Sequence, residues 1–453
     1  MFNATDIPIN GFVRHVALHD GLISAPLAAL ATKLVSGAPG YLGDKARLGG
    51  VVGGGEELAA AAATDFEATF GAEVTAAVDE LSDDERELIA TQLPGSAGPA
   101  GAEGLEVFSP AALVRFVRWA KLFCQSRLDL ATLYYQFFSG AIDLAVPMLV
   151  DLSSGLADNA QTTVAQQIEL FELLSRASMM GLIPDAGQLR IHPFVGFDPK
   201  RALDDGSTVA TVKDAVMTKG FIGVKVYPEM GWSTFRNTAA SAGTPERAQA
   251  LDAILDEFFG WCADNEVPVT THCNHSNYPD PNSDAANFGS PDDWLHVLEA
   301  HPLLRLNLGH FGGAHDTPQA YTWTWTIANA MASYDGLYAD VGCQHVDDAA
   351  LMQVHFGVLG KIAKSTKMTN RLMFGTDWYM EAVNPNPNAF LAEFQRQYDA
   401  AFGPAQTAKF MSGNALRFLG LGAGSLTANG RRLRQRYDGL GLAAPSWLGK
   451  EAG

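Results

Sequence analysis

The sequence predicts an α/β protein built as a (β/α)8 barrel whose first strand is missing from the N-terminal end. Apolar runs of strand length alternate with segments of helical periodicity along most of the chain. This alternation is typical of βαβ units in a parallel sheet. The runs are almost continuously apolar, as expected for strands that are buried on both faces.

Seven runs have the length and composition of strands, whereas a closed barrel of this kind has eight. They cover residues 142–150, 189–195, 221–227, 267–272, 304–308, 336–341 and 371–376. Helical spacing of apolar residues predicts helices over 111–138, 163–177, 248–265 and 322–334.

Composition shifts divide the chain into four regions. Residues 1–47 are the expected N-terminal remnant of the barrel, and 48–110 form a Gly-, Ala- and acid-rich helical insertion with a linker at 94–104. Within the insertion, Ser82 followed by acidic residues predicts a helix start. Residues 111–425 are the expected barrel, and 426–453 a C-terminal tail.

The overall charge excludes some partners. A formal charge of −19 and a pI near 4.9 argue against nucleic acid or an anionic membrane as the main partner.

The four cysteines are scattered without a CxxC pair, which is typical of a reducing compartment. No apolar run reaches membrane-spanning length, and no secretory signal is recognisable. We expect a cytoplasmic protein.

Three of the predicted strands end at residues that can bind a metal or transfer a proton. They lead to His272, His310 and Asp377. Side chains at the C-terminal ends of parallel strands converge on one rim of a barrel, where active sites of this fold are built. Imidazole and carboxylate groups are ligands that zinc prefers. The sequence therefore predicts part of a hydrolytic metal site on this rim.

Six short motifs occur in the order found in the amidohydrolase superfamily. They are Ile-His-Pro-Phe-Val-Gly-Phe-Asp-Pro from 191, Gly-Val-Lys-Val-Tyr-Pro from 223, Thr-His-Cys from 271, Gly-His-Phe-Gly-Gly from 309, Phe-Gly-Thr-Asp-Trp from 374 and Gly-Asn-Ala-Leu-Arg-Phe-Leu from 413. In these motifs the chain resembles the amidohydrolase-related (family 2) branch, which includes aminocarboxymuconate semialdehyde decarboxylase, resorcylate decarboxylases, hydrolases and lactonases.

The resemblance implies roles for the strand-end residues. His272 matches a metal ligand, and Asp377 matches a ligand that also orients or deprotonates the attacking water. His310 matches a residue that acts as acid, base or polarising group. The cofactor implied is a divalent metal, zinc in first place. The resemblance also implies a small-molecule substrate and a homodimer as one assembly. The expected reaction is hydrolysis of an amide, ester or lactone bond, and non-oxidative decarboxylation of an unsaturated or aromatic acid is the alternative.

One part of the family pattern is missing. Related sequences carry a His-x-His pair at the end of the first strand, and the N-terminal region contains no such pair. Either the sequence begins just past that strand, or the metal site has been lost. In the second case the chain would be an inactive barrel that serves as a binding protein.

Further residues near the strand ends are candidates for binding the substrate. They are Lys225, Tyr227, Trp232, Asn274 and Trp378. Packing at the core or rim is an equal interpretation for the aromatic residues. Asp151, His192 and His345 also follow predicted strands, and His275 is a weaker substitute for His272 as a ligand. His15 and His19 are expected on the surface.

Overall fold

The structure is a computed structural model. It describes residues 3–8, 25–35, 37–55, 66–92, 110–274, 287–313, 320–342, 349–382, 387–422 and 427–449. The chain forms two compact units that alternate along the sequence. Unit 1 contains Met1–Leu144, Leu156–Arg190 and Trp378–Asn388, and unit 2 contains Ala145–Gly155, Ile191–Asp377 and Ala389–Gly453.

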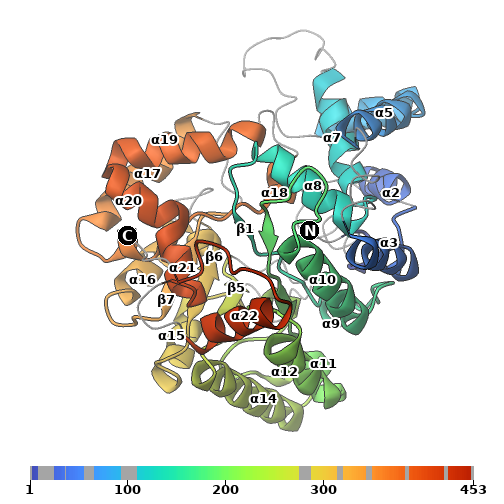
Figure 1. Cartoon of the computed structure of the whole chain (residues 1–453). Helices are drawn as coiled ribbons and strands as arrows, with labels where there is room; N and C mark the ends of the chain where they lie inside the picture. Colours follow the sequence, from blue (N-terminus) through green and yellow to red (C-terminus); the bar gives the residue numbers. More distant parts are fainter. Residues whose placement is uncertain are drawn as a thin grey trace. The chain divides into compact units, whose positions relative to one another are not determined.

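Unit 2 is built around a parallel sheet in which strands follow one another in chain order. The order is β3-β4-β5-β6-β7-β8, and every neighbouring pair is parallel. Figure 1 shows β5, β6 and β7 next to one another. The strand bounds are β3 Phe194–Gly196, β4 Gly223–Val226, β5 Val269–His272, β6 Leu306–Gly309, β7 Leu337–Asp340 and β8 Leu372–Met373.

A seventh parallel run joins this sheet at β3. Strands β1 (Leu144–Ala145) and β2 (Arg190–Ile191) pair with each other, and the border between the units runs through both. Beyond β1 the chain continues alongside β3, where Met148 forms a parallel bridge with Phe194. All seven predicted strand regions are thus confirmed. The fold is an α/β barrel type, and within the described residues no strand pairing closes the sheet into a ring.

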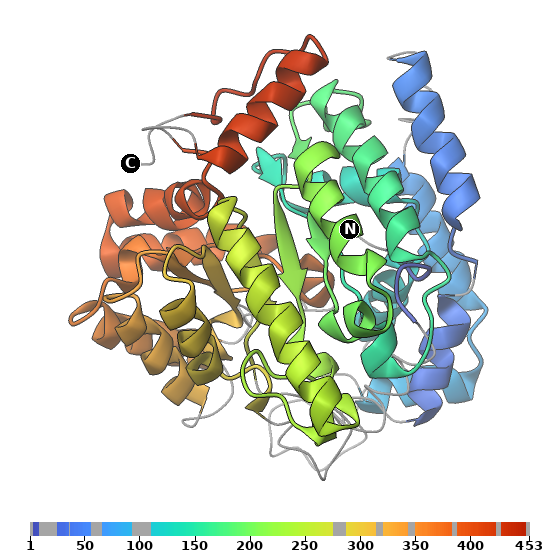
Figure 2. The ribbon, with the colours of Figure 1, turned by 90° about the horizontal axis from the view of Figure 1, so that it is seen from below.

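Helices return the chain between the strands of unit 2. Thr244 caps α14 by accepting from Arg247 N, and the following proline suits the first helical turn. Helix α14 is the long yellow-green helix of Figure 2. The main helices of unit 2 are α11 Pro199–Asp204, α12 Ser207–Thr218, α13 Ala239–Ala242, α14 Pro245–Asp264, α15 Pro291–Ala300, α16 Ala320–Ala330, α17 Ala349–Ala363, α19 Phe390–Phe402, α20 Pro404–Ala408, α21 Asn414–Leu419 and α22 Ala428–Gly439.

The segment expected as a C-terminal tail contains α22, which packs into unit 2. Asn429 Nδ2 donates to the carbonyls of Ile222 and Leu419, both at 2.8 Å. The Tyr437 hydroxyl lies 3.0 Å from Nε2 of His192. Because these polar groups are buried and bonded, α22 is part of the folded unit.

Unit 1 is mainly helical. Its helices are α2 Ala25–Leu34, α3 Tyr41–Gly54, α5 Phe66–Asp79, α6 Asp83–Gln92, α7 Pro110–Leu122, α8 Arg127–Phe137, α10 Val164–Met179 and α18 Trp378–Glu381, while the short α9 Ser153–Leu156 crosses the border between the units. None of the helices that the structure describes is long and apolar enough to span a membrane.

Two predictions of helix positions in unit 1 can be compared with the structure. The helix start at Ser82 is confirmed, because Ser82 Oγ accepts from Glu85 N and the Glu85 carboxylate accepts from Ser82 N. The helical character predicted over 111–138 is confirmed, and the segment forms two helices. Ser126 accepts from Asp129 N and starts α8 as a separate helix after α7. Helix α3 runs across the boundary expected between residues 47 and 48, and the linker at 94–104 lies outside the described residues.

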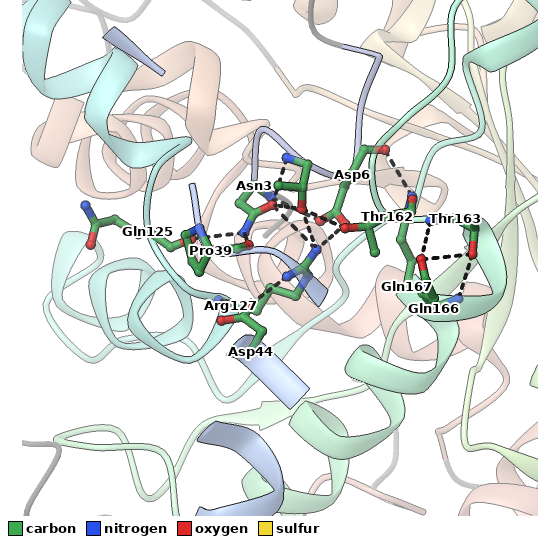
Figure 3. A network of polar contacts seen from close by, with 11 residues as sticks. Asn3, Asp6, Pro39, Asp44, Gln125, Arg127, Thr162, Thr163, Gln166 and Gln167 are labelled. Atoms are coloured by element: carbon green, nitrogen blue, oxygen red, sulfur yellow. Dashed lines mark hydrogen bonds and ion pairs between the residues drawn. The ribbon is translucent and has the colours of Figure 1, made fainter. Parts of the chain in front are cut away.

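A buried arginine holds the N-terminal segment in unit 1 (Figure 3). The guanidinium of Arg127 pairs with Asp6 and with Asp44, the latter at 2.5 Å, and the side chains of all three are at most 2% exposed. Burial raises the pKa of both carboxyls, and the charge of Arg127 acts in the opposite direction. Thr162 N donates to Thr5 O at 2.7 Å and fixes the segment against the start of α10.

Replacing this arginine tests how far unit 1 depends on the network. We expect Arg127→Met to lower the free energy of unfolding by about 3–5 kcal/mol, because two buried carboxylates lose their cation. The exposed pair of Lys33 with Glu85 provides a control, and Lys33→Ala should change it by less than about 1 kcal/mol. Urea unfolding measures both. A loss for Arg127→Met no larger than the control's would contradict this account.

Candidate active site at the strand ends of unit 2

Two histidines meet at the ends of adjacent strands. His272 is the last residue of β5 and is paired with Gly309, the last residue of β6. His310 follows directly, so that the two imidazole rings lie 4.4 Å apart between centroids, edge to face. A side chain at position 309 would bring Cβ to 2.7 Å from the carbonyl oxygen of Thr271, so glycine allows this close approach.

A buried carboxyl group forms a hydrogen bond with one edge of the His272 ring. Glu229 lies in the short 3-10 helix η1 (Pro228–Met230) after β4, and its Oε1 is 2.5 Å from Nδ1 of His272. Glu229 is 4% exposed. The ring of Tyr227 stacks on His272 with 4.7 Å between centroids. The imidazole is therefore fixed on two sides, with its Nε2 edge left for other partners.

The position of the proton between Glu229 and His272 depends on the shifts in the pKa values of the two groups. Burial raises the pKa of Glu229 to about 8, against the lowering effect of His310 and Lys225. Burial, followed by the charges of His310 and Lys225, lowers the pKa of His272 well below its usual value. One proton thus lies between Oε1 of Glu229 and Nδ1 of His272. When Glu229 is deprotonated it accepts from Nδ1–H, and Nε2 of His272 then offers a lone pair.

Asp340 organises the neighbouring strand ends. Its Oδ1 accepts from the backbone N–H groups of Gly342 at 3.0 Å and His310 at 3.3 Å, and its Oδ2 accepts from Asn307 Nδ2 at 2.6 Å. Nδ1 of His310 donates to the Gly342 carbonyl at 3.0 Å. Because a carbonyl can only accept, Nε2 of His310 carries a lone pair in the neutral ring.

Asp377 completes the group from the segment after β8. A Cβ atom built on Gly342 would lie 3.5 Å from Cβ of Asp377 and 3.7 Å from Nδ1 of His310, so both residues border the same glycine. Asp377 is exposed and has φ +43°, and His310 has φ +62°. Positive φ is rare for residues other than glycine, and such strain is concentrated at functional sites.

Lys225 brings a buried amine close to these carboxyl groups. It lies on β4, is 8% exposed, and its Nζ is 5.4 Å from the centroid of the Tyr227 ring. Burial lowers the pKa of Lys225, and the charges of Asp340, Glu229 and Asp377 partly restore it. The amine is therefore a candidate anchor for an anionic or carbonyl group of a ligand.

The other predicted ligand-binding residues differ in their placement. Asn274 follows His272 and lies against Gly313, close to the strand-end group. Trp232 is 1% exposed within unit 2, which leaves no ring face for a ligand. Trp378 belongs to unit 1, where its ring packs edge-on against Tyr134 and Phe137.

The remaining strand-end candidates make contacts away from this group. His192 is fully buried against Tyr437. Asp151 forms an ion pair with Arg201 of α11 at 2.6 Å. Burial raises the pKa of Asp151 to about 7, with the Arg201 charge opposing the shift. His15, His19, His275 and His345 lie outside the described residues.

Two important residues were not among the sequence predictions. Asp340 ends β7 in the same way as His272 ends β5, so the strand-end rule could have identified it. Glu229 follows a proline in a loop, and no periodic pattern marks it.

The donor set fits part of a metal site. With Nδ1 of His272 bound to Glu229, the ring presents Nε2 to a cation, and an outer carboxylate of this kind commonly orients metal-binding histidines. Asp377 offers a second ligand from the segment after β8. Within the described residues, no group of three His, Cys, Asp or Glu side chains is arranged to hold a metal ion.

Comparison with known proteins identifies the class of this barrel. The sequence model of the family described as Amidohydrolase matches residues 190–421, just over half of the chain. This range contains His272, His310, Asp340 and Asp377. The protein belongs to the amidohydrolase family, whose superfamily comprises metal-dependent hydrolases and decarboxylases.

Several solved structures are similar at low identity. An amidohydrolase from Burkholderia multivorans is 12% identical, with 66% of this chain and 91% of that chain covered and a TM-score of 0.45. A protein described as amidohydrolase II is 15% identical, covering 65% and 89%, with a TM-score of 0.40. An uncharacterized TIM-barrel protein from Bordetella bronchiseptica is 16% identical, covering 65% and 83%, with a TM-score of 0.39. No curated protein matches the sequence.

The hydrogen bonds of Asp340 lead to a stability prediction. We expect Asp340→Ala to lower the free energy of unfolding by about 3 kcal/mol, because three partly buried donors lose their carboxylate acceptor. The control is Asp335→Ala, which removes an 89% exposed carboxylate from its pair with Arg371 and should cost less than about 1 kcal/mol. Equal losses in urea unfolding would show that Asp340 does not organise the strand ends.

The raised pKa of Asp151 predicts a pH dependence. Between pH 4 and 7 the folded state holds the Asp151 proton more tightly than the unfolded state, so this residue's contribution to stability falls as pH rises. Asp151→Asn removes that titration. Its free energy of unfolding, relative to the original chain, should therefore rise from pH 4 to pH 7, by on the order of 3 kcal/mol.

Denaturant unfolding at several pH values measures this difference. Asp204→Asn, at a 65% exposed side chain, controls for the loss of one negative charge. A difference between Asp151→Asn and the original chain that stays constant over this range would contradict the assignment.

Proposed function

We propose that this protein is a hydrolase that cleaves an amide, ester or lactone bond of a small molecule at the strand ends of unit 2. One observation carries the proposal: His272 and His310 face each other at 4.4 Å on neighbouring strand ends, next to Asp340 and Asp377. Paired imidazole and carboxylate groups can move protons to and from a reacting carbonyl.

The residues of the chain divide this work. His310 has its Nδ1–H bound to a carbonyl, so its Nε2 can take the water proton from Asp377 and pass it to the leaving group. Asp377 is exposed next to it and accepts a proton from the attacking water. Lys225 binds or polarises the substrate carbonyl or a neighbouring anionic group. Asn274 lies against Gly313, close to His272, and is a candidate contact for the substrate.

A divalent metal, zinc in first place, is the proposed cofactor. Nε2 of His272 and the carboxylate of Asp377 would hold it, with Glu229 orienting the imidazole. When bound, such an ion lowers the pKa of water to roughly 7 and so supplies hydroxide at neutral pH. Deprotonated Glu229 favours the imidazole tautomer that can bind the ion.

The proposal is tested by hydrolysis and zinc content together. The probes are 4-nitrophenyl acetate, γ-butyrolactone and acetanilide, each with the zinc-loaded protein. We expect His310→Ala to lower kcat/KM by roughly 10²–10⁴, the range for loss of a general acid or base. His301→Ala, whose imidazole pairs with Asp256 outside the site, is the matched control and should keep the rate.

Zinc content gives a readout that does not depend on turnover. His272→Ala and Asp377→Ala should each reduce bound zinc, measured by mass spectrometry, and His301→Ala should not. Full zinc content in both variants would refute the ligand assignment. If none of the three bonds is cleaved and 2,6-dihydroxybenzoate instead releases carbon dioxide, decarboxylation replaces hydrolysis as the function.

A further inference from the structure

A hollow in unit 2 lies between the loop after β4 and the start of α15. Its volume is about 260 Å³, below the roughly 300–1,000 Å³ typical of sites for drug-sized ligands. Its lining combines hydroxyl and amide groups, one guanidinium, one carboxylate and one imidazole with the apolar rings of Phe235 and Phe288. The polar groups that bear on its chemistry are Ser233, Arg236, Asn237, Ser241, Asp293 and His296. The cavity is thus small and of mixed polarity.

Arg236 is held at this cavity in an unusual way. Its backbone has φ +56°, a conformation that residues other than glycine, asparagine and aspartate rarely adopt. Its guanidinium lies 4.7 Å from the centroid of the Phe235 ring, within the range of a cation–π contact. Among the described residues, no carboxylate lies within ion-pair distance of it. In a chain with a formal charge of −19, this leaves a positioned cation for an outside anion.

The loop that carries Arg236 is rigidly bonded. Asn237 donates through both its backbone N–H and Nδ2 to Asp252 Oδ1, at 3.0 and 2.7 Å. Ser241 Oγ donates to Asn237 Oδ1 at 3.0 Å. Ser233 Oγ lies 2.8 Å from Asp293 Oδ2 and so links the loop to α15. The cavity wall is therefore formed before a ligand arrives, which reduces the entropy lost on binding.

The charges in the cavity restrict the anion. Asp293 faces the same space as Arg236, and burial raises the pKa of its carboxyl. A doubly charged phosphate would be repelled by Asp293, whereas a carboxylate brings a single charge. The planar guanidinium can also bind a carboxylate through two parallel hydrogen bonds. An N–H or O–H group on the same ligand would find acceptors in Asp293 and in the amide oxygens.

We propose that this cavity binds a small monocarboxylic acid, with Arg236 on the carboxylate and Asp293 and the polar wall on a neighbouring amide or hydroxyl group. The cavity adjoins the strand-end site through residues 287–289. A Cβ atom built on Gly289 would lie 3.7 Å from Oε1 of Glu229. The proposal concerns binding alone, so it does not depend on the hydrolysis proposed above.

N-acetylglycine and N-acetylglycinamide are matched probes for this cavity. They have the same size and amide group, and only the first carries a carboxylate. Isothermal titration calorimetry of the full chain should show that N-acetylglycine binds at least about tenfold more tightly than the neutral amide, because a charge-assisted contact is lost.

Arg236→Asn is the decisive variant. Asparagine tolerates positive φ, so the loop should keep its backbone while the guanidinium is lost. Affinity for N-acetylglycine should fall by about tenfold or more. Arg247→Gln is the control, because it removes one exposed arginine of the same unit from its pair with Asp204. Its affinity should match that of the original chain.

A further variant guards against loss of the loop fold. Arg236→Lys keeps the charge without the planar pair of donors and should bind with intermediate affinity. Equal binding of the acid and the amide, or an unchanged affinity in Arg236→Asn, would overturn the proposal. So would the absence of any heat from N-acetylglycine at millimolar concentration with the original chain.

Discussion

The candidate active site depends on the register between β5 and β6. His272, the last residue of β5, stands opposite Gly309, the last residue of β6. His310, the next residue after Gly309, therefore lies beside His272. A shift by one residue would turn every side chain of the strand to the other face. The absence of a side chain at Gly309 allows the two strand ends to approach. The backbone pairing of β5 and β6 therefore sets the relative position of the two histidines.

Two carboxyl groups then give each histidine its orientation. Glu229 binds Nδ1 of His272 directly, whereas Asp340 acts on His310 through the backbone and through Gly342. Both histidines therefore turn their Nε2 atoms to other partners. Such supporting residues are as important as the reacting groups, because a misplacement of about 1 Å can cost about 10²-fold in rate.

Much of this arrangement could be predicted from the sequence. The seven strand regions and their order follow from the apolar runs, and the strand-end positions of His272 and His310 follow from the parallel fold. The sequence could not show that the ring of Trp232 points into the core, because a position after a strand does not determine the direction of a side chain. The break between α7 and α8 was missed because apolar periodicity continues across it, and only the Ser126 cap marks it. The positive φ of Arg236 has no sequence signal, because arginine is not a residue that favours it.

The way in which the two units share the chain determines when unit 1 can form during translation. Unit 1 takes residues from the N-terminus, from the middle and from Trp378–Asn388. Within it the ring of Phe123 lies 4.9 Å from that of Tyr379, a contact between segments more than half the chain apart. Asp6 must likewise wait for Arg127 to be translated before its charge is balanced. A nascent chain on the ribosome therefore cannot complete the N-terminal unit first, and for most of translation its early helices lack part of the packing that they have in the folded unit.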